Sequence, residues 1–196
     1  MERRKFFKLG LMGMSVFALT GKTRALEFYP KPSDKKWAVL YGTWCGTARD
    51  AVVWISEGMG GIAEVFDIRE QADLKRFDHI VIGSAIRGMK IHPLLQEYIE
   101  KNKAWLSPKV RGLYIVCGNM AKPVGEKQKE QYIDNHLAQL LGVKDVPAKA
   151  FDGRMTKILL EDQERKLIES LGLPLDWDNL KRSDCLEFGK IILNRT

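Results

Sequence analysis

The sequence predicts an α/β fold, a doubly wound parallel sheet of five strands with helices on both faces. From residue 37 onward, strand-like and helix-like stretches alternate along the chain, and this alternation is typical of sheets built from strand–helix–strand units. Residues 79–83 (HIVIG) and 112–117 (GLYIVC) are almost wholly apolar, as expected for central strands that are buried on both faces. Residues 62–68 (IAEVFDI) alternate between apolar and polar side chains and add a further strand.

The remaining elements follow from the same periodicities. Residues 49–59 carry apolar side chains at helical spacing, and residues 126–141 end at Gly142, a typical helix terminator. Residues 156–174 form an extra charged amphipathic helix, so we treat 156–178 as an insertion before the last helix of one domain, residues 37–196. We therefore expect strands at 37–41, 62–68, 79–83, 112–117 and 146–151, and helices at 49–59, 93–106, 126–141 and about 179–193.

The composition is that of a globular protein, which excludes a disordered chain, a fibre and a polytopic membrane protein. Of the 196 residues, 45% are apolar and 29% are charged. The net charge of +7 lies almost wholly in residues 1–36, which carry nine basic and three acidic side chains. Residues 37–196 carry 23 basic and 22 acidic side chains. The folded part therefore has no basic bias, and we expect no nucleic-acid partner.

The N-terminus has the organisation of an export signal. A basic stretch at residues 3–8 (RRKFFK) precedes an uncharged apolar run at 9–19, and a polar stretch then ends on the small residue Ala25. As a helix this run is about 16 Å long, roughly half the thickness of a bilayer's hydrocarbon core. A signal peptide therefore fits the run better than a membrane span. Residues 3–8 resemble the twin-arginine motif, which implies export of the folded protein by the twin-arginine machinery.

We therefore expect a twin-arginine signal peptide at residues 1–25 and an extended linker at residues 26–36, which contain Pro30 and Pro32. The folded protein is expected to be periplasmic or otherwise extracytoplasmic. The alternative is an uncleaved signal that tethers the protein to the inner membrane.

No metal or disulfide site is expected from the cysteines and histidines. Cys45, Cys117 and Cys185 are too few and too widely spaced for a disulfide framework or a CxxC zinc site. The three histidines, at positions 79, 92 and 136, are equally dispersed. Cys45 stands just before a predicted helix, a position that lowers the pKa of a free thiol.

The candidate ligand-binding residues lie in the loop after the first predicted strand. Residues 42–49 (GTWCGTAR) combine small and hydroxylated side chains with a glycine and lead into a helix. At such a position backbone N–H groups and hydroxyls converge on a phosphate, and the helix N-terminus adds partial positive charge. Ligands of doubly wound sheets bind at the carboxyl ends of the strands, where this loop lies. The loop matches neither the G-x-G-x-x-G fingerprint nor a P-loop.

This loop resembles that of the flavodoxins, T/S-x-T-G-x-T, which binds the phosphate of FMN. Thr43 matches the first position and Gly46 matches the glycine. Cys45 and Ala48 stand where the second and third hydroxyls usually are, and Thr47 offers a hydroxyl one place earlier. The resemblance implies a flavodoxin-like fold with strand order 2-1-3-4-5 and FMN as cofactor.

Other motifs resemble the flavodoxin-like family that includes menaquinone-dependent protoporphyrinogen dehydrogenase. Residues 81–87 (VIGSAIR) match its V-I-G-x-x-I-R segment, His92 follows, and residues 176–178 (DWD) lead toward the last helix. By this resemblance three loops share the cofactor: one binds the phosphate and two flank the isoalloxazine. The implied phosphate residues are Thr43, Trp44, Cys45, Gly46, Thr47 and Ala48, and the implied ring residues are Ser84, Ala85, Ile86, Arg87, Gly88, Gly118, Asn119 and Met120.

Four details carry specific expectations. Arg87 is a cation in a ring-flanking loop, where it would stabilise the anionic reduced flavin and raise its potential. Trp44 either stacks on the flavin or packs its loop against the following helix. The charged run 161–166 is interpreted as a solvated helix face, and residues 152–154 (DGR) as a turn, with contact to a substrate or partner as the alternative.

The function predicted from the sequence is that of an exported FMN-binding redox protein. It would pass electrons between the flavin and a partner protein, a quinone or a small organic substrate, and no catalytic acid or base is assigned. The insertion carries acidic residues beside its basic ones, which weakens the case for membrane contact. Two alternatives remain: an oxidoreductase like protoporphyrinogen dehydrogenase, and a flavin-free binding module, which the replacements Cys45 and Ala48 favour.

Overall fold

Five parallel strands form the central sheet in the predicted order, β2-β1-β3-β4-β5. The computed structural model describes residues 33–118 and 124–195. The expected signal peptide, residues 26–32 of the linker, Asn119 and Met120 therefore lie outside the described residues. The strands are β1 (Trp37–Gly42), β2 (Ala63–Asp67), β3 (His79–Ala85), β4 (Val110–Cys117) and β5 (Ala148–Asp152).

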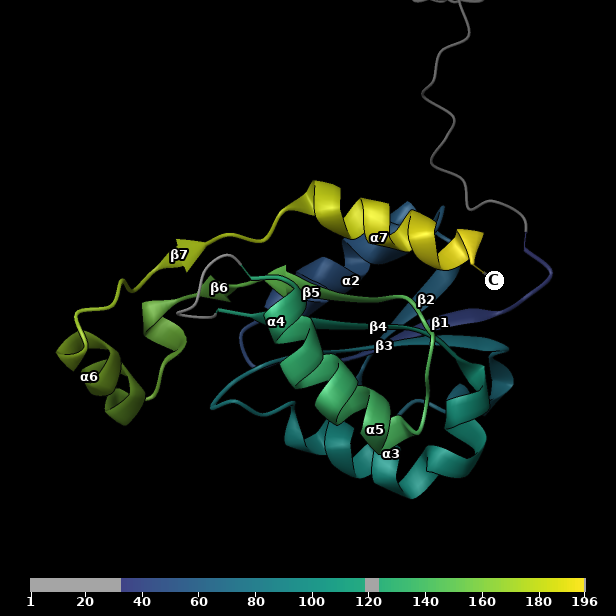
Figure 1. Ribbon diagram of the computed structural model, residues 1–196, viewed down its shortest axis with the longest axis horizontal. Helices are drawn as coiled ribbons and strands as arrows, with labels where there is room; N and C mark the ends of the chain where they lie inside the picture. The colour runs from purple at the N-terminus through teal and green to yellow at the C-terminus, as the bar shows by residue number, and fades with distance from the viewer. Residues whose placement is uncertain (1–32, 119–123, 196) are drawn as a thin grey trace, which may run out of the picture.

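Helices cover both faces of the sheet, as Figure 1 shows. One face carries α2 (Thr47–Gly58) and α7 (Arg182–Asn194), and the other carries α3 (Pro93–Leu106) and a continuous helix of three labelled parts. Those parts are α4 (Glu126–Lys129), η5 (Glu130–Leu137), which has π-type hydrogen bonds, and α5 (Ala138–Leu141). Short 3₁₀ turns complete this body: η2 (Ile68–Glu70), η3 (Leu74–Arg76) and η4 (Ser107–Lys109).

The two helical layers explain why the strands are apolar throughout. Along β1, Ala38 and Leu40 point into the core beneath α3 and α5, whereas Val39 and Tyr41 point into the core beneath α2 and α7. Successive side chains of a strand point to opposite faces. Each central strand therefore needs apolar side chains at both odd and even positions, which the sequence provides.

Two glycines let α2 and α7 pack at close range. A Cβ atom on Gly58 would overlap the carbonyl oxygen of Leu186, and one on Gly189 would overlap the carbonyl oxygen of Ile55. The backbones of the two helices are therefore in direct contact at both points. This packing fixes the position of α2, whose N-terminus faces the site described below.

The insertion forms a separate lobe that projects beyond the carboxyl ends of the strands (Figure 1). We call residues 154–178 the arm. Its short strands pair antiparallel, and its helix begins at Asp162 rather than near Thr156. The DWD segment belongs to the second of these strands, and the last helix starts at Arg182, later than expected. The arm contains β6 (Arg154–Met155), η6 (Lys157–Leu159), α6 (Asp162–Ser170) and β7 (Trp177–Asp178).

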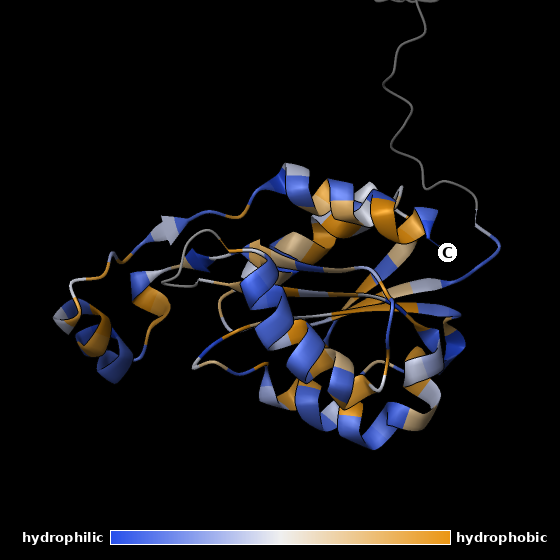
Figure 2. Cartoon of the chain, in the orientation of Figure 1, coloured by the Kyte–Doolittle hydropathy of each residue, from blue (hydrophilic) through white to orange (hydrophobic). Residues whose placement is uncertain are grey.

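Apolar side chains gather on the outside of the arm. Ile158 is 84% exposed and Leu171 is 55% exposed, and α6 buries none of its own side chains against the described part of the protein. Figure 2 shows the apolar colour on η6 and on one side of α6. Amphipathic helices of globular proteins normally cover their apolar stripe with core residues. The arm is therefore unlike the four packed helices of the body.

Among the residues that the structure describes, no helix combines the length and the apolar character that a membrane crossing requires.

The contact between α2 and α7 can be tested with Gly189→Ala. The added methyl group meets a backbone carbonyl that cannot move aside, so we expect the free energy of unfolding to fall by about 2 kcal/mol and the melting temperature by roughly 4–8 °C. Thermal unfolding followed by circular dichroism measures the change. Lys190→Ala, on the exposed side of the same helix, is the matched control, with a change within about 0.5 kcal/mol. Equal effects of the two substitutions would contradict the packing described here.

Candidate functional site

A cavity of about 290 Å³ lies at the carboxyl ends of β1, β3 and β4. Its inner wall comes from the ends of these strands and the segments that follow them, and its outer wall comes from the arm. The inner wall consists of Thr43, Trp44, Cys45, Thr47, Ala85, Ile86, Arg87, Gly88, Val116 and Gly118. The arm and the residue before it contribute Gly153, Arg154, Met155, Thr156, Leu160, Glu164, Leu167, Ile168 and Trp177.

The N-terminus of α2 opens onto this cavity without a side-chain cap. Gly46 precedes the helix with a φ of 83°, a left-handed conformation that suits glycine. The Gly46 N–H donates to Oγ1 of the nearly buried Thr43 at 3.0 Å, which closes the loop. No side chain of the described residues caps the helix start, so the N–H groups of its first turn are available to a ligand. Together with the helix dipole they form an anion-binding end.

Tyr114 of β4 fixes the first turn of α2 from below. Its fully buried hydroxyl donates to the Ala48 carbonyl at 3.2 Å. The ring passes over Gly83 of β3, where a Cβ atom would overlap it. The glycine of the VIGSAIR segment is therefore explained by packing, because it makes room for the tyrosine that holds α2 in place.

Ser84 is the predicted ring residue that the structure turns away from the cavity. It is fully buried, its hydroxyl accepts the His92 N–H at 2.9 Å, and it donates to the Ala85 carbonyl at 2.7 Å. These bonds join the two ends of the loop between β3 and α3. Ser84 therefore shapes the loop that presents Arg87, and its side chain is not part of the cavity wall. Gly46 and Ala48 are likewise absent from the lining side chains and contribute backbone to the loop.

A tight turn presents Arg87 to the cavity. The backbone groups of Arg87 and Lys90 bond to each other in both directions at 3.1 Å, and Gly88 and Met89 between them have φ values of 55° and 62°. Two positive φ angles are typical of the type I′ turn, which glycine favours. Met89, at the tip, is 70% exposed.

Arg87 is paired with Glu164 of the arm. Its Nε donates to Oε1 at 2.8 Å and its Nη2 donates to Oε2, so the two side chains form a bidentate ion pair across the cavity. This hydrogen-bonded pairing lowers the pKa of Glu164 and raises that of Arg87. Arg87 is therefore a cavity cation, as expected, but Glu164 offsets its charge, and the interpretation of residues 161–166 as a solvated helix face is corrected at Glu164. The sequence pattern did not predict this contact, because 77 residues separate the two side chains.

Trp44 packs within the protein and also lines the cavity. Its ring lies 4.8 Å from the ring of His92, between centroids. His92 is nearly buried, and burial lowers the pKa of its imidazole. A Cβ atom on Gly42 would collide with the His92 side chain, so this glycine allows His92 to support Trp44. His92 thus acts behind the loop and not as a cavity residue.

Cys45 lines the cavity as a free thiol, but its acidity differs from the expectation. Burial raises the pKa of the Cys45 thiol, and the opposing charges of Arg87 and Arg154 do not reverse the rise. The loss of solvation therefore outweighs the effect of the two nearby arginines. Cys117 and Cys185 are also free and buried.

The arm supplies the outer wall of the cavity, which the sequence analysis did not predict. Trp177 lies so close to Gly118 that a Cβ atom there would overlap its indole ring, and Arg154 bonds to both Asp50 and Asp178. The segment expected to be a turn at residues 152–154 instead leads directly from β5 into β6. One feature of the sequence could have predicted this wall. The extra helix has an apolar stripe, and no strand or helix was predicted to pack against it.

Within residues 33–118 and 124–195, no three histidine, cysteine or carboxylate side chains gather in a way that would hold a metal ion. The cavity combines an uncapped helix start, two arginines that are each paired with a carboxylate, and an outer wall that is largely apolar.

The fold agrees with comparison to protein families. The family model described as "Flavodoxin domain" matches residues 38–171, so the chain belongs to the flavodoxin-domain family. No curated protein matches the sequence.

Solved structures of flavodoxin-like proteins are similar in fold and distant in sequence. Oxidised flavodoxin 1 from Bacillus cereus is 14% identical with a TM-score of 0.51, and the match covers 82% of this chain and 98% of that one. A flavodoxin, WrbA-like protein from Agrobacterium tumefaciens has the same identity and TM-score, with coverages of 83% and 97%. The Flv1 flavodiiron core from Synechocystis sp. PCC6803 is also 14% identical with a TM-score of 0.50, with coverages of 83% and 36%.

The ion pair between Arg87 and Glu164 predicts a pH dependence of stability. Because the pKa of Glu164 is lowered in the folded state, its contribution is complete above the unfolded-state pKa, about 4.3 for glutamate. The contribution is lost as the pH falls through the lower folded-state pKa. We therefore expect wild type to be more stable than Glu164→Gln at pH 6, and the difference to shrink by pH 3. Urea unfolding at both pH values measures it.

Glu169→Gln is the matched control, since Glu169 lies on the same helix and pairs with the exposed Lys157 at 3.0 Å. A difference between wild type and Glu164→Gln that is equal at the two pH values would contradict the role given to this pair.

Proposed function

We propose that this protein is an FMN-binding redox protein. The observation that carries the proposal is the uncapped start of α2 at the floor of a cavity, where the loops after β1 and β3 part. A phosphate ester fits this end of the helix, and a planar ring fits between the inner loops and the arm. Membership of the flavodoxin-domain family supports the same ligand. The cavity, at about 290 Å³, lies just below the usual volumes of ligand pockets, about 300–1,000 Å³.

The residues of the chain have distinct tasks in this proposal. The N–H groups at the start of α2 and the hydroxyls of Thr43 and Thr47 hold the phosphate, while Ala85–Gly88 and Gly118 border the ring. The apolar side chains of the arm keep water from the ring. When bound, FMN supplies the ability to accept and release electrons, and the protein sets its potential through nearby charges.

The exposed apolar surface beside the cavity supports a site for the electron partner. Met89, at the tip of the turn that presents Arg87, and Ile158, Leu159 and Leu171 of the arm are all exposed. A redox partner protein or a quinone would contact this surface, because exposed apolar patches mark interaction sites. The arm carries six acidic and four basic residues, which disfavours an anionic membrane as the partner. The VIGSAIR segment supports a relationship to the protoporphyrinogen dehydrogenase group and hence a small organic substrate as the narrower alternative.

A flavin-free binding module is the second candidate, and one observation favours it. Glu164 already satisfies Arg87 inside the cavity, and Cys45 and Ala48 lack the hydroxyls of the flavodoxin loop. In that case the cavity would take a smaller anion at α2.

Colour tests the proposal directly. The chain from Leu26 to Thr196, purified from cytoplasm, should be yellow, with flavin absorbance in the visible and FMN released on denaturation. Added FMN should restore the colour to stripped protein. Colourless protein that does not bind added FMN would support the flavin-free module instead.

The paired charges at the cavity predict opposite changes of the midpoint potential. Arg87→Ala leaves Glu164 as an unpaired negative charge and should lower the potential of bound FMN, whereas Glu164→Gln leaves a positive charge and should raise it. Each change should be on the order of 20–40 mV, from Coulomb energies at an effective dielectric near 20. Redox titration of both variants measures it. The double variant should lie near wild type, and unchanged potentials throughout would exclude Arg87 from the flavin's surroundings.

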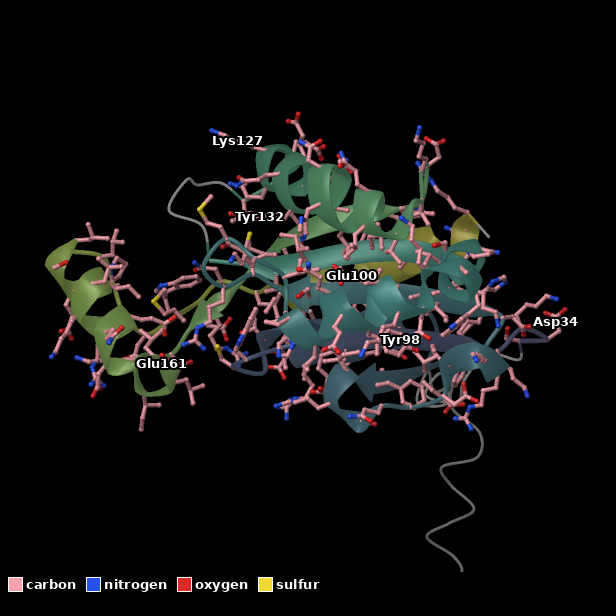
Figure 3. The ribbon with its side chains drawn as sticks, turned by 90° about the horizontal axis from the view of Figure 1, so that it is seen from below. Asp34, Tyr98, Glu100, Lys127, Tyr132 and Glu161 are labelled. Carbon is pink, nitrogen blue, oxygen red and sulfur yellow. The ribbon has the colours of Figure 1, made fainter. Side chains whose placement is uncertain are left out.

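We also infer export by the twin-arginine route and a periplasmic or otherwise extracytoplasmic location, with a tethered form as the alternative. Asp34, near the start of the described chain, and Glu161, on the arm, lie at opposite ends of the molecule (Figure 3). A partner that binds the arm would therefore contact the end of the described structure that lies away from Asp34. Substitution of both arginines, Arg3→Lys with Arg4→Lys, should keep the protein in the cytoplasm. Cell fractionation measures it, and undisturbed export would refute the targeting proposal.

A further inference from the structure

Arg154 is a cavity residue whose orientation is fixed by two carboxylates. Its Nη2 donates to Oδ2 of Asp50 at 2.7 Å, and its Nε donates to Oδ2 of Asp178 at 2.8 Å. Its side chain is 27% exposed. A guanidinium has five N–H donors. Within the described part of the chain these two bonds use two of them, which leaves the Nη1 group free to meet a ligand.

The position of Arg154 joins the arm to the first turn of α2. Arg154 begins β6, Asp178 ends β7, and Asp50 lies in the first turn of α2. The same cavity is lined by Thr43, Cys45 and Thr47, from the loop that leads into α2. The guanidinium is therefore held beside the end of the helix that is left uncapped.

The charge of Asp50 makes a cation necessary here. A carboxylate in the first turn stabilises the helix itself, but it repels any anion that binds to the same N–H groups. The ion pair with Arg154 neutralises this carboxylate, whose other close partner, Arg49, is mostly exposed.

The positive charge of Arg154 also acts on Cys45, in the loop between β1 and α2. Although burial raises the pKa of the Cys45 thiol, the charges of Arg87 and Arg154 both act to lower it. Cys45 is one of the two positions where the flavodoxin-type loop would have a hydroxyl. The cation therefore lies near the position from which a phosphate-binding group is missing.

We propose that Arg154 is the specificity-determining residue for the phosphate ester of the flavin, and that it replaces the hydroxyl donors that Cys45 and Ala48 lack. Planar guanidinium groups bind phosphate oxygens in pairs of charge-assisted hydrogen bonds. This inference rests on the proposed binding of FMN. It adds that the protein distinguishes FMN from riboflavin by a residue of the arm.

Binding of FMN and riboflavin to purified protein, followed by quenching of flavin fluorescence, tests the inference. Arg154→Met should weaken FMN binding by about 10- to 100-fold, as expected for loss of a charge-assisted hydrogen bond. Riboflavin, which lacks the phosphate, should change by less than about threefold. Arg182→Met is the matched control, because Arg182 pairs with Glu57 at the other end of α2 and does not line the cavity. It should leave both affinities unchanged.

A purely structural role of Arg154 makes a different prediction. If Arg154 only fastens the arm, Arg154→Met should weaken both flavins equally, and that result would overturn the inference. Arg154→Lys keeps the charge and loses the planar fork, so it should reduce the preference for FMN while leaving riboflavin unaffected, even if the methionine variant folds poorly. Asp50→Asn removes the repelling carboxylate and keeps a side-chain oxygen that can accept from Arg154, so it should not weaken FMN binding. An equal fall for FMN and riboflavin in this variant would indicate fastening alone.

The pH dependence gives a second readout. The second pKa of a phosphate monoester is about 6, so the preference of wild type for FMN over riboflavin should increase between pH 5 and pH 7. It should increase less in Arg154→Met. Equal affinity of wild type for the two flavins would overturn the inference while leaving flavin binding intact. Failure to bind either flavin would overturn both proposals.

Discussion

The strand order imposes the constraint on which the site depends. The chain leaves β1, adds β2 on one side, and then returns to place β3 on the other side. The loops that follow β1 and β3 must therefore diverge, which opens a crevice at the carboxyl ends of these strands. The start of α2 lies at the bottom of that crevice, and Tyr114 holds it there through the Ala48 carbonyl. The strand order thus creates the crevice, and core packing places the anion-binding end of α2 within it.

The arm changes what this crevice can do. Residues 154–178 add an outer wall to this crevice that is largely apolar but also holds Arg154 and Glu164. Two arginines, Arg87 and Arg154, join the arm to the body through ion pairs with Glu164 and Asp50. The charges that hold the arm are therefore the same charges that a bound anion would meet. A bound anion would therefore compete with Glu164 and Asp50 for the arginines that attach the arm to the body.

The sequence predicted the fold well because local patterns specify it. Apolar runs such as 79–83 and helical spacing such as that of 93–106 reflect burial on both sheet faces, and each pattern lies within one element. The site was less predictable, because its contacts join distant segments. Glu164 was expected to be solvated, yet it pairs with Arg87. Ser84 was expected beside a ring, yet its hydroxyl closes a loop. Neither contact follows from the spacing of residues in the sequence. The first depends on how the arm packs against the body, and the second on how the loop between β3 and α3 folds.

The account is tested most directly by the backbone amides at the start of α2. In a ¹⁵N-labelled protein, addition of FMN should shift the amide signals of Gly46, Thr47, Ala48 and Arg49 more than those elsewhere in the chain. Riboflavin should shift them much less, because it brings no phosphate to the helix end. Binding of FMN that leaves these four signals in place would contradict the central claim.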